Sequence, residues 1–87
     1  MIEAVEPRYT RHIPERLLPG VLYISEHYET AMHLCACGCE AHTVTPFGSQ
    51  GPWGLTSEDG TVTLDGSILN RPCNAHYWIR RNEVVRA

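Results

Sequence analysis

Residues 33–40 read His-Leu-Cys-Ala-Cys-Gly-Cys-Glu and contain three of the four cysteines of this 87-residue chain, Cys35, Cys37 and Cys39. Because side chains alternate between the two faces of an extended strand, the three thiols would project to one side. The glycine within the stretch permits a local turn that brings thiols around a single ion. The fourth cysteine, Cys73, is distant in sequence, and the spacing predicts one metal site that draws on both segments.

Zinc is the expected metal, because it takes four ligands in a tetrahedron and thiolates bind it at about 2.3 Å. We expect Cys35, Cys37, Cys39 and Cys73 to hold one structural Zn²⁺. Two alternatives stay open: a site of three cysteines with one of His33, His42 or His76, and free buried thiols without a metal. A closed all-cysteine site would contribute folding energy and leave no position for a catalytic water.

Disulfides explain the cysteines less well. Thiols separated by single residues cannot easily pair with one another, and only one of them could reach Cys73. Residues 1–12 are polar and charged and lack the apolar run of a signal peptide. Apolar runs elsewhere are far shorter than the roughly 20 residues that span a bilayer. We therefore expect a cytoplasmic protein with reduced thiols and no membrane partner.

The length and net charge of the chain argue against some classes of function. The net charge of −3 argues against a nucleic-acid partner, because phosphate recognition needs a basic face. A chain of 87 residues forms a small core that often requires a metal or another staple. We expect a single zinc-stapled β domain over residues 1–87, with residues 1–7 loosely held.

The pattern between glycines and prolines is typical of short strands. β-forming residues with period-two alternation predict strands at 21–25, 30–35, 42–47, 53–56, 61–64, 75–80 and 83–86. Asp59-Gly60 predicts a hairpin turn, and Arg81-Asn82 predicts a second. Helical signal is limited to one turn at 14–18. The fold class is mostly β: a small antiparallel sheet or partly open barrel with at most one short helix.

Three further residues could take part in catalysis or metal binding. His76 follows Cys73 by three residues, and His33 lies just before the cysteine cluster. Either imidazole could act as a general base oriented by the metal turn, as a ligand or as a donor to one. Ser67 follows Asp65-Gly66, where a serine is usually a turn residue. It becomes a nucleophile only when a base within hydrogen-bond reach takes its proton.

Together these stretches resemble a known family, the BubE-like domain found beside bacterial ubiquitin-like conjugation genes. The resemblance runs from about residue 20 to residue 86 and includes Gly-Val-Leu-Tyr-Ile-Ser at 20–25, the 33–39 cluster, Ser-Ile at 67–68, Cys73 and His-Tyr-Trp-Ile at 76–79. It implies a serine-type peptidase that trims a ubiquitin-like precursor or removes the modifier from its targets, with zinc in a structural role.

The resemblance also implies roles for particular residues. Ser67 falls on the family's Ser-Ile motif as nucleophile, His76 on its His-Tyr-Trp-Ile motif as base, and His33 on the histidine before the cysteines. Glu26 and Asn70 are candidates to complete the set.

This chain departs from the family in three places. Gly66 stands where a proline is more common, Ala75 stands where a serine is frequent, and the segment between Ser-Ile and the cysteine is shorter. The shorter segment changes how Ser67 is placed against His76. Two other function classes remain: a non-catalytic zinc-binding interaction module, and a zinc hydrolase with an open metal site that uses His33 or His76 as ligand.

Overall fold

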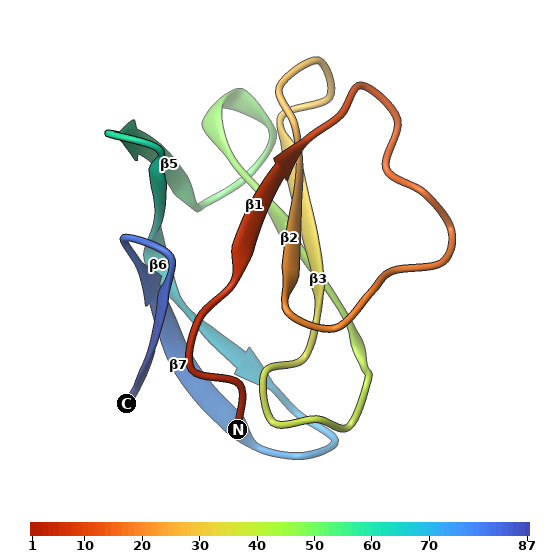
Figure 1. The fold of residues 1–87 in the computed structure, drawn as a ribbon, viewed down its shortest axis with the longest axis vertical. Helices are drawn as coiled ribbons and strands as arrows, with labels where there is room; N and C mark the ends of the chain where they lie inside the picture. Colours follow the sequence, from red (N-terminus) through yellow and green to blue (C-terminus); the bar gives the residue numbers. More distant parts are fainter.

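The computed structural model describes residues 1–87 as two four-stranded sheets (Figure 1). The first has the order β1 (Glu6–Tyr9), β2 (Val21–Ser25), β3 (Thr30–Leu34) and β4 (His42–Pro46). The second has the order β5 (Gly54–Glu58), β6 (Thr61–Asn70), β7 (Ala75–Arg80) and β8 (Glu83–Arg86). All pairs are antiparallel except β1 with β2, which is parallel. The mostly β fold class is confirmed, and the sheets do not close into a barrel.

Both predicted hairpin turns are present. Asp59 and Gly60 have φ of 51° and 80°, and Arg81 and Asn82 have φ of 49° and 69°. Two consecutive positive φ values are what a two-residue type I′ turn requires. The side chain of Asn82 also accepts a hydrogen bond from the Val62 N–H at 2.8 Å, which ties the second turn to β6.

Two local predictions are wrong. Residues 14–18 form no helix, and the structure has only a 3₁₀ turn at Gly48–Gln50. The segment instead buries Leu17 against the outer face of the first sheet, and the Leu18 N–H donates to the Tyr23 hydroxyl at 3.0 Å. The predicted strand at 61–64 is too short, because Asp65-Gly66 forms a bulge within β6 rather than a turn.

The N-terminal segment is hydrogen-bonded to both sheets. The Ile2 N–H donates to the Ala36 carbonyl at 2.7 Å, and the Val5 N–H donates to the Asn82 carbonyl at 2.8 Å. Residues 6–9 then pair with β2. Residues 2–7 thus have defined partners in the structure.

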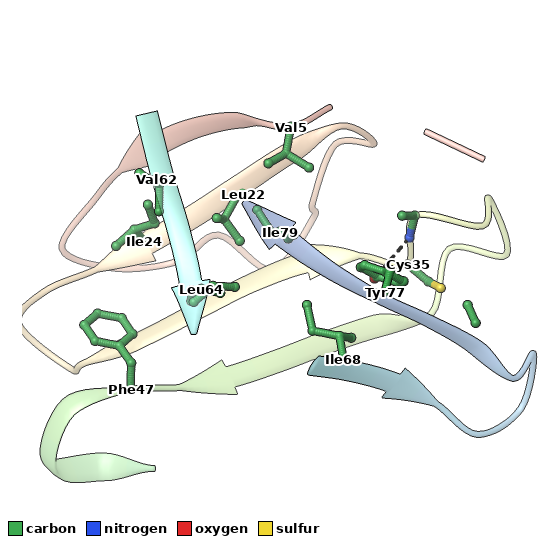
Figure 2. Packing of buried hydrophobic residues seen from close by; sticks show 13 residues of the cluster. Val5, Leu22, Ile24, Cys35, Phe47, Val62, Leu64, Ile68, Tyr77 and Ile79 are labelled. Atoms are coloured by element: carbon green, nitrogen blue, oxygen red, sulfur yellow. Dashed lines mark hydrogen bonds between the residues drawn. The ribbon is translucent and has the colours of Figure 1, made fainter. Parts of the chain in front are cut away.

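The core lies between the two sheets (Figure 2). Leu22 and Ile24 of β2 meet inward side chains of the second sheet, among them Leu64 and Tyr77. The opposite face of β2 is covered by the segment that precedes it, so all five residues of this strand are buried. The structure contains no helix long and apolar enough to cross a membrane.

Candidate functional site

The four cysteines meet at one end of the two sheets. Their sulfur atoms all lie within 4.8 Å of one another, and the Cys35 sulfur is 3.5 Å from that of Cys37 and 3.6 Å from that of Cys73. Sulfurs at about 2.3 Å around a tetrahedral ion are about 3.8 Å apart. The cluster therefore fits a single metal ion, and no histidine belongs to it.

The loop between β3 and β4 is folded to present its three thiols. The Cys35 N–H donates to the Ala41 carbonyl at 2.8 Å, and the Gly38 N–H donates to the Cys35 carbonyl at 3.1 Å. Gly38 has φ of 98°, the conformation that a glycine allows at this turn. The Cys39 N–H donates to the Cys37 sulfur at 3.4 Å, a hydrogen bond that favours a thiolate.

The fourth thiol comes from the second sheet. Cys73 lies in the loop between β6 and β7, and its sulfur is 3.7 Å from the Asn70 carbonyl oxygen. In Figure 1 this light-blue loop and the yellow-green cysteine loop of the first sheet lie together at the lower end of the molecule. A metal at this point would join the two sheets across the end of the core.

The thiols influence one another's protonation. Burial raises the pKa of Cys35, but hydrogen bonds from the Cys37 N–H and from neighbouring side chains lower it to about 7. The Cys39 N–H lowers the pKa of Cys37, whereas hydrogen bonds to the thiols of Cys39 and Cys35 raise it to about 12. Four thiols this close can all ionise only around a cation, and soft sulfur ligands select zinc or another thiophilic metal.

His33 lies in the core rather than at the surface. It is 1% exposed, and its Nε2 is 2.7 Å from the Tyr77 hydroxyl. Burial lowers the pKa of His33 from 6.5 to about 4, so the ring is neutral at pH 7. The Tyr77 hydroxyl also accepts the Ala36 N–H at 3.3 Å, the dashed line in Figure 2. His33 thus supports the cysteine loop through Tyr77.

Ser67 and His76 lie on the other side of the second sheet from His33. Both are exposed, whereas Ile68 and Tyr77 beside them point into the core, so Ser67 and His76 share the outer face. Leu69, two residues after Ser67, is directly opposite His76. No hydrogen bond joins the Ser67 hydroxyl to the His76 ring in this structure.

The bulge next to Ser67 depends on glycine. Gly66 has φ of 137°, and a Cβ there would lie 2.7 Å from Cδ1 of Trp53. A proline, with φ fixed near −65°, could not adopt this conformation, so the bulge in this form requires glycine at position 66.

Neither candidate for a third residue lies beside His76. Asn70 donates from Nδ2 to the Thr43 hydroxyl of β4 at 3.0 Å, on the inner side of the sheet. Glu26 follows β2 at the end of the molecule opposite the cysteine loop (Figure 1).

Tyr77 was not predicted from the sequence as a partner of the cysteine loop. Its position in the alternating pattern of β7 indicated an inward side chain, but the pattern could not identify the groups it meets.

These features define a small two-sheet β protein with a four-cysteine cluster that could hold a metal ion. The sequence model of the BubE family, described as a bacterial ubiquitination-like system serine protease, matches residues 9–87, and the chain belongs to this family. The match confirms the resemblance and begins earlier in the chain than the recognised motifs. No curated protein and no solved structure matches the chain.

Proposed function

We propose that this chain is a serine-type peptidase that processes or removes a bacterial ubiquitin-like modifier and carries a structural Zn²⁺. The family match over residues 9–87 is the observation that carries the proposal. The exposed pair Ser67 and His76, on adjacent strands and on one face, supplies the two groups that acyl transfer needs.

In the proposed reaction, Ser67 attacks the carbonyl carbon that ends the modifier, and His76 takes the hydroxyl proton. The tetrahedral intermediate collapses when His76 returns that proton to the leaving amine, and water then hydrolyses the acyl-enzyme. Backbone N–H groups near Gly66 and Ser67 would stabilise the oxyanion. Both side chains are exposed, and the His76 ring lies beside Trp78, with the ring centroids 5.7 Å apart, so the reaction requires a change of side-chain rotamer that brings Ser67 and His76 into hydrogen-bond contact when substrate binds.

The four cysteines would hold the metal in a closed site. Zinc would supply folding energy there and neutralise the thiolates. A cytoplasmic location fits this role, because reducing conditions keep the thiols available as ligands. The metal would staple residues 1–87 into a single domain and leave the proton transfers to Ser67 and His76.

The test is cleavage of the ubiquitin-like protein of the same system, extended at its C-terminus by a fluorescent reporter peptide. Ser67→Ala and His76→Ala should each lower kcat by about 10³-fold or more and retain the metal and the fold. Ser57→Ala, an exposed serine on β5, is the matched control and should cleave like the unmodified chain. Unchanged cleavage by Ser67→Ala would eliminate the serine mechanism.

Two other outcomes identify the remaining classes. Loss of cleavage on chelation, with the fold intact, would indicate a zinc hydrolase with an open metal site. Tight binding of the modifier without turnover by any variant would indicate a zinc-stapled interaction module.

A further inference from the structure

The second half of β6 has a strand on one side only. β5 pairs with β6 from Glu58↔Thr61 to Gly54↔Asp65 and ends there. β7 continues beside β6 as far as Asn70↔Ala75. The Trp53 side chain lies against Gly66, and residues 67–70 beyond it therefore form an open sheet edge inside an otherwise paired strand. The one hydrogen bond from this half of β6 to β4 joins the Asn70 and Thr43 side chains, and no backbone pair forms between the two strands.

The register shows which backbone groups face this edge. The Ala87 N–H donates to the His76 carbonyl, so the polar backbone groups of His76 face β8. Those of Tyr77 and Ala75 then face β6, because successive residues of a strand alternate in direction. Ile68, the partner of Tyr77, is thus hydrogen-bonded to β7. The N–H and C=O groups of Ser67 and Leu69 consequently point away from β7, toward the open edge.

This edge has the properties of a peptide-binding site. Unpaired N–H and C=O groups two residues apart match the backbone of an extended peptide. Leu69 is 44% exposed on the outer face, where it offers apolar contact to alternate side chains of such a peptide. A strand added here would lie about 4.8 Å from β6, beside the Ser67 hydroxyl.

We propose that the edge at Ser67–Leu69 binds the C-terminal tail of the modifier as an additional β-strand, with its scissile carbonyl beside Ser67. This inference rests on the proposed function. The proposed reaction identifies the bound segment as the modifier's tail, because the scissile carbonyl must reach Ser67, which is itself an edge residue. Only an extended segment with free backbone groups can pair with this edge. Specificity would then combine backbone pairing with contacts to the folded part of the modifier.

Amide hydrogen exchange tests the pairing directly. ¹⁵N-labelled, zinc-loaded Ser67→Ala protein is saturated with the reporter-extended modifier, which it would bind without cleaving. The Leu69 amide should exchange at least about tenfold more slowly in the complex. The Ile68 amide, already bonded to β7, should change little and serves as an internal control. Unchanged exchange at Leu69 in a saturated complex overturns the proposal.

Proline substitution provides a second measurement. Leu69→Pro removes the edge donor without removing a bond to β7, and it should weaken modifier binding about tenfold relative to Leu69→Ala. Ser57→Pro removes the corresponding donor from the open edge of β5 and should leave binding unchanged. Equal affinities of Leu69→Pro and Leu69→Ala would refute the added strand. If Leu69→Pro does not fold, the exchange experiment decides.

The two proposals fail separately. Binding is measured on the Ser67→Ala background, so it does not depend on catalysis. Slowed exchange at Leu69 combined with full cleavage by Ser67→Ala would refute the serine mechanism and retain the docking edge. Unchanged exchange at Leu69 combined with loss of cleavage in Ser67→Ala would refute the docking edge and retain the serine mechanism.

Discussion

Replacing Tyr77 by phenylalanine should weaken both the fold and the metal site. Tyr77 is 0% exposed, and its hydroxyl contacts His33 Nε2 at 2.7 Å and the Ala36 N–H at 3.3 Å. Tyr77→Phe keeps the ring in the core and removes only the hydroxyl. His33 Nδ1 has no partner already, so the variant leaves a buried imidazole without any hydrogen bond.

The expected magnitude follows from these contacts. A buried polar group that loses its partner costs about 1–3 kcal/mol. Two such groups predict a loss of about 2–6 kcal/mol in the free energy of unfolding, a large share of the stability of a small domain. Ala36 lies between two of the metal-binding cysteines, so the loop also loses an anchor. Zinc affinity should fall by about 10- to 100-fold, as when an outer partner of a metal ligand is removed.

The assay combines urea denaturation of the zinc-loaded protein with zinc competition against a chromophoric chelator. Tyr23→Phe is the matched control, because the Tyr23 hydroxyl accepts one hydrogen bond, from Leu18 N–H at 3.0 Å, on the far face of the first sheet. It should cost about 1 kcal/mol and leave zinc affinity unchanged. Equal losses for the two variants, or an unchanged zinc affinity of Tyr77→Phe, would refute this account.

Three further outcomes are expected. Cys73→Ser should lose stoichiometric zinc and its near-UV circular dichroism together, and retention of one tightly bound zinc would contradict a four-cysteine site. Gly66→Ala should destabilise the protein by about 2–4 kcal/mol in urea melts, because its φ is positive and its Cβ would meet Trp53. Gly60→Ala, with no atom within 4 Å of its Cβ, should cost only about 1 kcal/mol. The pKa of His33 falls from 6.5 to about 4 on folding, so the unfolded chain is protonated at a higher pH than the folded chain. The free energy of unfolding that is present above pH 6.5 is therefore lost progressively as the pH falls toward 4. Between pH 7 and 5 the unfolding free energy should fall about 2 kcal/mol more for the unmodified chain than for His33→Gln, and equal slopes would disprove the assignment.

Local signals in the sequence predicted most of the strands. Alternation gave the ranges of β2, β7 and β8, and the two hairpin turns followed from residue pairs that accept positive φ. β1 was not predicted, because Glu6–Tyr9 is short and mostly polar. Its parallel pairing with β2 depends on the path of residues 10–20, which no local pattern describes.

In the candidate site, too, some features could be predicted from the sequence and others could not. The spacing of the cysteines was sufficient to predict the cluster, because few geometries other than a metal site use closely spaced thiols with a distant fourth. The location of His33 was not predictable, because alternation places it on a face but does not reveal that the second sheet covers that face. The bulge at Gly66 was mistaken for a turn, since glycine after aspartate is common in both.

The position of Cys73 links the metal to the candidate chemistry. Ser67 lies on β6 and His76 on β7, and the loop that joins these strands contains Cys73. A metal bound to Cys73 and to the three cysteines of the first sheet would restrain that loop, and with it the register of Leu69 against His76. No hydrogen bond joins Ser67 to His76, and the His76 ring packs only beside Trp78, with the ring centroids 5.7 Å apart, so this restraint would help the paired strands to fix the separation of the two side chains. A closed metal site can thus govern the rate of a reaction in which the metal itself takes no part.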